Sequence, residues 1–224
     1  MYWQKLGRVV SLSISEDNGI ELIKPNDLNI LSVGVSTGGI AEIRMAKDSP
    51  QRHIIATTLD ERGVNDAKKY IDEQGYADQI ELRLEDVSEK LPHDDESFDY
   101  IYARLVLHYL SKEKLSSTLK ELHRVLKKNK ILYIVVRSSV TKDAINAIKH
   151  DDTTGYSYYY LGGDTSAPIS KRFFHTEDSI SSFVKGAGFS IDHIASYEER
   201  LYADFMRSVE APHTDFLIEV RAKK

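Results

Sequence analysis

The stretch LSVGVSTGG, residues 31–39, decides the fold of this chain because it joins a short apolar run to glycine-rich turn residues. The β-branched residues around its start predict a buried strand over 29–35. Glycines allow a sharp backbone turn and a close approach to a ligand. Gly34 and Gly38 stand where such a loop needs glycine, and Ser36 lies between them. Taken alone, the stretch fits a cofactor loop and a plain strand-to-helix turn equally well.

Strand and helix patterns alternate after this stretch, as far as residue 137. The strands are expected over 52–58, 79–84, 97–104 and 131–137. The helices are expected over 39–48, 61–75 and 111–128, with Ser111 as an N-cap and Gly75 as a C-cap. Repeated strand–helix–strand units predict a mainly parallel sheet with helices on both faces.

The composition changes after residue 140. Residues 141–152 could form a helix, and residues 153–174, which hold Gly, Pro and four tyrosines, are expected to form a functional loop. A helix capped by Thr176 is expected over 175–188. Two strands, over 189–200 and 214–224, predict an antiparallel hairpin at the sheet edge.

The expected fold class is therefore α/β, a doubly wound, seven-stranded, mostly parallel sheet with a C-terminal hairpin. The whole chain, 1–224, is expected to be one domain. Residues 1–27 would be an N-terminal extension, and residues 141–175 would be a cap or lid insertion.

Composition excludes several classes of function. The net charge is −5 and no stripe of Lys or Arg is present, which disfavours a nucleic-acid partner. No apolar run reaches the roughly 20 residues that span a bilayer, and no signal peptide is recognised, so a cytoplasmic protein is expected. The absence of cysteine removes thiolate nucleophiles and Cys-based zinc sites. The histidines show no HExxH spacing, so no metal is expected. The oligomeric state stays open.

Four segments, in order, resemble the class I S-adenosylmethionine (SAM) dependent methyltransferases. ILSVGVSTGG (30–39) stands where this family has its acidic-x-Gly-x-Gly-x-Gly loop. LEDVSEKLPHDDESFDYIYARLVLHYL (84–110) is similar to the family's third-strand acid, Leu-Pro turn and Phe-Asp fourth strand. LKELHRVLKKNKILYIVV (119–136) and FFHTEDSISSFVKGAGFSI (173–191) resemble its later helices and fifth strand. The resemblance runs from about residue 28 to the C-terminus and implies a Rossmann-like methyltransferase fold with SAM as the cofactor.

The resemblance also implies which residues meet the methionine end of SAM. Gly34, Ser36 and Gly38 would line it. Ala103 and Arg104, at the end of the fourth strand, would approach the amino group through their backbone carbonyls.

The adenine end would be met by residues after the third strand. Asp86 would accept a hydrogen bond from the adenine amino group, and the Val87 N–H would face a ring nitrogen. The alternative for Asp86 is a solvated turn acid.

Four positions depart from the family's pattern. Ser32 replaces the acid of the first strand, Ser36 replaces the middle glycine, and Lys130 replaces a glycine before the fifth strand, at what we interpret as a surface turn. The ribose-binding acid is the fourth: Thr58 occupies its position and Asp60 follows two residues later, where it could instead cap a helix. A threonine hydroxyl offers less acceptor capacity than a carboxylate. We therefore expect SAM binding that is weaker than that of a loop with all three glycines.

Methyl transfer depends mainly on aligning the acceptor atom behind the methyl group. His108 is the best-placed candidate for a general base, and a packing role in the helix cap is an equal alternative. His175 is a weaker candidate. Tyrosines such as Tyr158 and Tyr160 could stack on a planar acceptor, surround a cationic one, or only pack a lid.

The leading hypothesis is a soluble, cytoplasmic enzyme that transfers the methyl group of SAM to an unidentified small molecule. The alternative is a non-catalytic ligand-binding protein on the same fold, which the altered loop favours. A nicotinamide-dependent oxidoreductase is a third possibility, and the Phe-Asp strand and the terminal hairpin oppose it.

Overall fold

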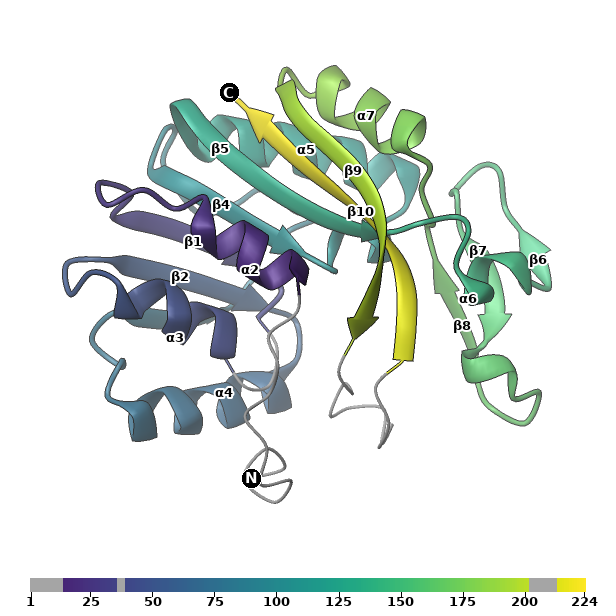
Figure 1. Cartoon of the computed structure of the whole chain (residues 1–224), viewed down its shortest axis with the longest axis horizontal. Coiled ribbons are helices and arrows are strands. Elements are labelled where there is room, and N and C mark those ends of the chain that lie inside the picture. Colours follow the sequence, from purple (N-terminus) through teal and green to yellow (C-terminus); the bar gives the residue numbers. More distant parts are fainter. Residues whose placement is uncertain (1–13, 36–38, 202–212) are drawn as a thin grey trace.

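The main sheet of this computed structural model has seven strands. The structure describes residues 14–35, 39–201 and 213–224. The strands are β1 (Asn29–Val33), β2 (His53–Thr58), β3 (Ile80–Leu84), β4 (Phe98–Arg104), β5 (Leu126–Arg137), β9 (Ser190–Leu201) and β10 (His213–Lys223). Their order across the sheet is β3-β2-β1-β4-β5-β10-β9 (Figure 1). The first five run parallel, and β10 lies antiparallel between β5 and β9. The expected doubly wound sheet with an antiparallel hairpin is confirmed.

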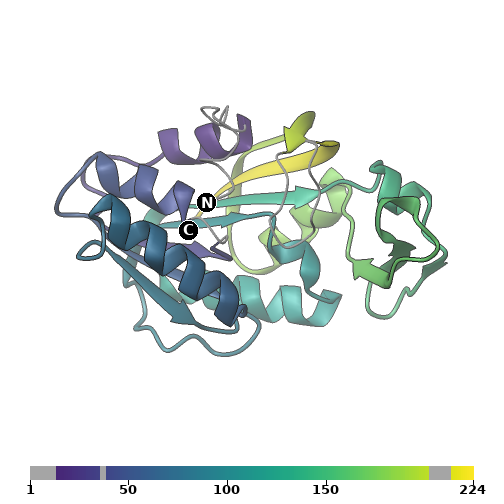
Figure 2. The ribbon, with the colours of Figure 1, turned by 90° about the horizontal axis from the view of Figure 1, so that it is seen from below.

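Helices cover both faces of this sheet (Figures 1 and 2). They are α2 (Ile14–Glu21), α3 (Ile40–Lys47), α4 (Glu61–Gln74), α5 (Lys112–Val125) and α7 (Glu177–Gly186). Neighbouring residues of β1 point to opposite faces: Ile30 packs with the first three of these helices, and Leu31 packs with α5 and α7. Both side chains are fully buried, and each such burial stabilises the fold by about 1.5–3 kcal/mol.

Side chains cap these helices where the sequence predicts caps. Asp60 accepts from Arg62 N at the start of α4, and Gly75 ends that helix with a left-handed φ of 81°. Ser111 accepts from Lys114 N at the start of α5, and Thr176 likewise caps α7. These signals are local, so they are readable from sequence.

Residues 141–174 differ from the expectation of one helix and one loop. The helix α6 covers only Lys142–Ile145. It is followed by a three-stranded antiparallel sheet of β6 (Lys149–His150), β7 (Ser157–Tyr160) and β8 (Ile169–Arg172), with a short 3-10 turn, η2 (Leu161–Gly163), between the last two. Backbone pairing with β7 already begins at Ile148 N, which donates to Tyr158 O at 2.8 Å, and this ends the helix. This small sheet lies beyond the carboxyl end of β5 (Figures 1 and 2).

The boundary between α5 and β5 also differs from the expectation. The strand begins at Leu126, so the helix is shorter than predicted. Asn129 takes a left-handed φ of 62°, and its N–H donates to Lys224 O at 2.9 Å. Lys130 is part of the strand, and its ammonium pairs with Asp27 and Asp99. It is therefore an ion-paired strand residue and not a surface turn.

The N-terminal extension contributes α2 to one face of the sheet. Tyr100 and Tyr133 donate from the sheet to Gly19 O and Ser15 O, each at 2.6 Å. A Cβ on Gly19 would come within 2.5 Å of the Tyr133 ring, so glycine is needed for this close contact. Among the described helices, none has the length and apolar character needed to cross a membrane.

Candidate active site

The carboxyl ends of β1 and β4 separate at the point where strand order reverses. The last register pair between them is Ser32 with Tyr102. Ala103 and Arg104 continue β4, pairing only with β5 on their other side. Leu105, directly after the strand, has a left-handed φ of 57°. Open α/β sheets bind ligands in the crevice that forms at such a reversal, and a strained backbone is common at these sites.

Gly34 forms the turn that leaves β1. Its φ is 84°, and a Cβ there would come within 2.8 Å of the Val106 side chain, so glycine is required twice over. The predicted loop residues Ser36 and Gly38 lie outside the described residues. The chain is described again from Gly39, which precedes α3 and provides no side-chain cap. Gly39 has no side chain to cap α3, and the start of a helix is where backbone N–H groups can bind a polar ligand.

A carboxyl group that sequence reasoning missed lies beside β1. Glu42, in the first turn of α3, accepts a hydrogen bond of 2.5 Å from the Ser32 hydroxyl and is only 2% exposed. Burial raises the pKa of this carboxyl, and the bond from Ser32 opposes the rise. A buried carboxyl from the following helix thus lies against Ser32, the residue at the position where the resemblance expects an acid. Its only sequence signal was its position in the first turn after the loop.

The Arg104 side chain turns away from β1. Its Nε donates to Ser15 Oγ at 2.7 Å, and its Nη2 pairs with the buried carboxylate of Glu199 at 3.1 Å. The expected role of Ala103 and Arg104 concerned only their backbone carbonyls. Their place at the end of β4 fits that role, and the side chain of Arg104 instead ties α2 to β9.

The expected ribose position lies at the end of β2. Thr58 is the last residue of that strand, and its hydroxyl accepts from Asp60 N at 3.2 Å. Asp60 uses its Oδ1 as the α4 cap. Two leucines, Leu59 at 69% exposure and Leu84 at 53%, lie at the ends of β2 and β3. Exposed apolar side chains beside polar groups suit a flat ring, and sequence reasoning did not single them out.

Asp86 follows β3 by two residues, at the same edge of the sheet. Its Oδ1 accepts from Ser88 N at 2.9 Å, while its Oδ2 has no hydrogen-bond partner among the described residues. Val87 is buried, and its carbonyl accepts from Thr118 Oγ1 of α5 at 3.1 Å. The turn is thus fixed in place with one carboxylate oxygen available.

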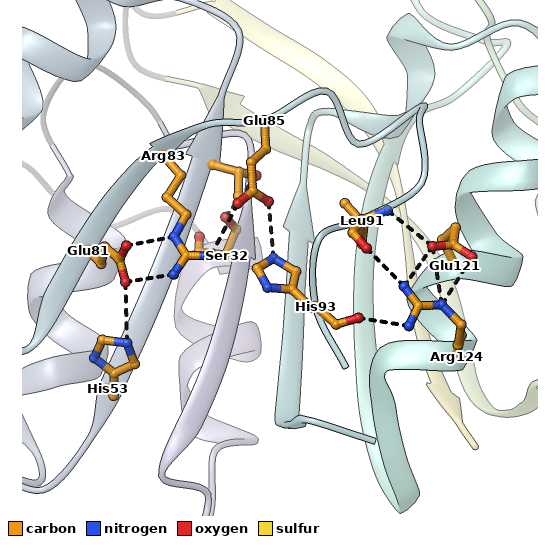
Figure 3. Close-up of polar contacts among 10 residues, drawn as sticks. Ser32, His53, Glu81, Arg83, Glu85, Leu91, His93, Glu121 and Arg124 are labelled. Carbon is orange, nitrogen blue, oxygen red and sulfur yellow. Dashed lines mark hydrogen bonds and ion pairs between the residues drawn. The ribbon is translucent and has the colours of Figure 1, made fainter. Parts of the chain in front are cut away.

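A clamp from α5 holds the chain after Asp86 (Figure 3). Arg124 donates to the carbonyls of Leu91 and His93, at 3.0 and 2.8 Å, and to the Glu121 carboxylate. Glu121 in turn accepts from Leu91 N at 3.1 Å. The ring of His93 contacts Glu85 at 3.0 Å, which joins the clamp to the end of β3. We call Glu121 and Arg124 together the clamp. Their contacts explain why the segment 119–136 carries this Glu and this Arg.

His108 lies on η1 (Leu107–Tyr109), the 3-10 turn that follows β4. It is 1% exposed, and its Nδ1 has no hydrogen-bond partner. Burial and the nearby charges of Arg172 and Arg137 hold the pKa of His108 well below its usual range. The imidazole is therefore neutral at ordinary pH, whichever role it has.

The small sheet meets η1 and the end of β5 in a buried polar junction. Phe173 N donates to His108 O at 2.9 Å, and His175 bridges to Ser138 beside β5. Several buried polar atoms at this junction have no partner among the described residues: His108 Nδ1, Tyr159 Oη, Arg172 Nε and His175 Nε2. Burial lowers the pKa of His175 to about 3 and raises that of Tyr159 to about 12. Sequence reasoning named the two histidines and missed Tyr159 and Arg172.

Comparisons with known proteins agree with this arrangement. Residues 30–129 match the family model of a methyltransferase domain. The matched methyltransferase domain and the shared fold support the class I SAM-dependent methyltransferase family for this chain. A SAM-dependent methyltransferase structure from Methanosarcina mazei is 19% identical, with a TM-score of 0.73, covering 91% of this chain and 95% of the other. One from Aquifex aeolicus is 18% identical, with a TM-score of 0.63, covering 98% and 95%.

The fold is not confined to proteins described as methyltransferases. The [4+2]-cyclase SpnF is 21% identical to this chain, with a TM-score of 0.61, covering 81% of this chain and 58% of the cyclase. No curated protein sequence matches the chain. The family therefore rests on the matched domain and the fold, while the acceptor must be argued from this methyltransferase's own residues.

The described residues fit SAM as the cofactor of this methyltransferase. The uncapped start of α3 and Gly34 suit the polar methionine end, Thr58 offers a hydroxyl, and Asp86 offers a free carboxylate oxygen. SAM carries a positive sulfonium, and Glu42 brings a carboxyl group next to Ser32 of β1. No group of three acidic or histidine side chains within the described ranges could hold a metal ion.

Proposed function

We propose that this methyltransferase transfers the methyl group of SAM to a small-molecule acceptor held between η1 and the small sheet. One observation supports this most directly. The residues proposed to bind the cofactor lie at the carboxyl ends of β1 to β4, and the buried polar junction lies directly after β4. A cofactor at the strand ends would thus lie next to buried polar groups that could meet the acceptor.

The cofactor roles follow from the open positions at this edge. Asp86 would accept from the adenine amino group with Oδ2, and Leu59 and Leu84 would contact the ring. Thr58 would meet the ribose, since Asp60 already caps α4. The bound cofactor supplies an activated methyl group, so the protein's main task is to align the acceptor.

His108 would act on the acceptor through its free Nδ1. Its low pKa keeps it neutral and able to take a proton, but also makes it a weak base. It therefore suits an acceptor whose proton is already acidic. Because the ring is buried against Tyr109 at 4.8 Å, a packing role is the alternative. His108→Asn separates the two: kcat would fall with unchanged cofactor affinity if His108 is the base.

The insertion over residues 141–175 would cover the acceptor. Its contacts to η1 and to the start of α5 support this: Tyr156 Oη donates to Tyr109 O at 2.9 Å, and Lys112 N donates to Thr154 O. Hydrogen exchange should slow over residues 153–174 when cofactor and acceptor bind. Unchanged protection at saturation would make the insertion ordinary surface structure.

Calorimetric titration with SAM and with its demethylated product, S-adenosylhomocysteine, tests the cofactor. We expect both to bind. A wild-type protein that gives no heat with either at millimolar concentration, with no recovery in Ser36→Gly, would contradict the proposal.

The second candidate is a non-catalytic binding protein on the same fold. Ser32 and Thr58, at two positions where the family carries acids, favour it. It predicts cofactor-site binding with no methyl transfer to any acceptor. The cytoplasmic location and the lack of a nucleic-acid partner stay predictions from the sequence.

A further inference from the structure

Arg172 is a buried cation without a carboxylate partner in the described part of the chain. It ends β8 and is 3% exposed. Its Nη2 donates to Tyr109 Oη at 2.8 Å, and its guanidinium lies 4.3 Å from the centre of that ring. These contacts hold the group in place but do not neutralise it. An uncompensated buried charge is costly, so a ligand of opposite charge would stabilise this site.

The neighbouring buried arginine is different. Arg137, at the end of β5, pairs with Asp215 at 3.1 Å and with Asp143 at 3.3 Å. The carboxylates of this junction are therefore already engaged. They therefore do not neutralise the positive charge of Arg172.

The groups around Arg172 are mostly hydrogen-bond donors or neutral. Tyr159 lies with its ring centre 6.0 Å from the guanidinium, and its raised pKa keeps the free hydroxyl protonated as a donor. His108 and His175 are neutral, each with a free buried nitrogen. A ligand rich in acceptor oxygens would satisfy Arg172 Nε and Tyr159 Oη together.

We propose that Arg172 and Tyr159 bind an anionic group, a carboxylate or a phosphate, on the methyl acceptor. This rests on the proposed methyl transfer, because it names the class of its acceptor. The tyrosine-rich sequence by itself allows a planar or a cationic acceptor. The unmatched guanidinium disfavours the cationic one, while the rings of Tyr109 and Tyr159 remain compatible with a planar one.

The test compares small aromatic probes that differ in charge. Benzoate, phenyl phosphate and neutral benzamide are titrated by ligand-observed NMR, with and without S-adenosylhomocysteine. Wild type should bind at least one anion roughly tenfold more tightly than benzamide. A preference for benzoate indicates a carboxylate, and a preference for phenyl phosphate indicates a phosphate. Arg172→Gln should abolish the preference and leave S-adenosylhomocysteine affinity unchanged.

A matched control is Arg221→Gln. Arg221 lies on β10 opposite Tyr133, and its Nε is also buried without a partner, so its loss should leave the anion preference intact. Tyr159→Phe, which removes only the hydroxyl, should weaken anion binding severalfold with benzamide unaffected. Tyr159→Phe provides the test of anion binding if Arg172→Gln does not fold.

Two results overturn the proposal. One is a wild type that binds benzamide as tightly as both anions, or binds none of the probes. The other is an anion preference that survives in folded Arg172→Gln or, if that variant is unfolded, remains undiminished in Tyr159→Phe. Failure of the proposed function has a different signature, since the protein would then not bind S-adenosylhomocysteine, and the anion titration without it still tests Arg172.

Discussion

The clamp after β3 and the junction at the small sheet differ in whether their polar groups have hydrogen-bond partners. In the clamp, Arg124 donates to Glu121, Asp95 and two backbone carbonyls. At the junction, Arg172 is more deeply buried and keeps Nε unpartnered. The clamp lies on the connection between β3 and β4, near the start of β5, whereas the junction lies beyond the ends of β4 and β5.

The difference separates structural from ligand-directed polar groups. A buried network stabilises a fold only when its members are satisfied, and the clamp meets that condition. Groups left unsatisfied lower stability unless something else binds them. The clamp therefore fixes the connection that follows Asp86, whereas the unsatisfied groups of the junction remain available for the acceptor that we propose.

Arg124→Met should give the largest effect. We expect the free energy of unfolding to fall by about 3 kcal/mol, because several charge-assisted hydrogen bonds are lost and the carbonyls they satisfied are left without a partner. Chemical denaturation measures this. The control is Lys128→Met, an exposed residue 4.0 Å from Glu96, whose loss should cost no more than about 0.5 kcal/mol. Equally small losses of unfolding free energy in the two variants would show that the clamp does not stabilise the fold.

Lowering the pH should reduce the free energy of unfolding, because His175 at the junction is buried in its neutral form. The pKa of His175 is about 3 in the folded protein, below the roughly 6.5 of an exposed histidine, so the unfolded chain takes up the proton first. Its contribution is complete above pH 6.5 and is lost as pH falls toward 3. Between pH 7 and 5 this amounts to about 2 kcal/mol.

The measurement is the pH dependence of unfolding in wild type and His175→Asn. Glu42 has a raised pKa and opposes the trend, so the difference between the two proteins isolates the histidine. The same slope in both would show that His175 is already protonated or exposed.

Asp86→Ala should reduce SAM affinity by about tenfold, through loss of one charge-assisted hydrogen bond. The clamp would still hold the turn, so the unfolding free energy should change little. Asp86→Asn keeps a carbonyl oxygen and should lose less. Calorimetry measures the affinities, and an unchanged affinity in Asp86→Ala would make Asp86 only a turn acid.

Arg172→Gln should have the smallest effect on stability, within about 1 kcal/mol of wild type and in either direction. The substitution leaves no buried carboxylate behind and loses one hydrogen bond to Tyr109 Oη and the contacts with the Tyr109 and Tyr159 rings, while it also removes a buried charge. Thermal unfolding without ligand measures it. A loss as large as that of Arg124→Met would show that Arg172 is structural, and would erase the contrast between the two regions.

Local signals account for the parts that could be predicted. The caps at Asp60, Ser111 and Thr176, the turn at Gly34 and the apolar strands depend on neighbours within a few residues. The sequence therefore predicted the alternation of elements, the sheet class and the terminal hairpin. It also placed the expected cofactor residues at one edge, because parallel strands end together.

Pairing between strands determined the rest. Residues 149–172 form a sheet because β7 pairs with both β6 and β8, and β5 begins at Leu126 because that residue pairs with Phe98 of β4. The strands of the small sheet have only 2 to 4 residues, too few for a clear alternation, and Phe98 is distant from Leu126 in sequence, so no local pattern signals either pairing.

By itself, the sequence determined the methyltransferase fold and the strand ends that would hold the cofactor, since periodicity, caps and glycine turns act over short distances. Only the tertiary structure showed that a buried Glu42 carboxyl lies against Ser32 and that Arg172 lacks a carboxylate partner among the described residues. Whether a charge is compensated depends on what surrounds it in space, and folding brings those neighbours from distant segments.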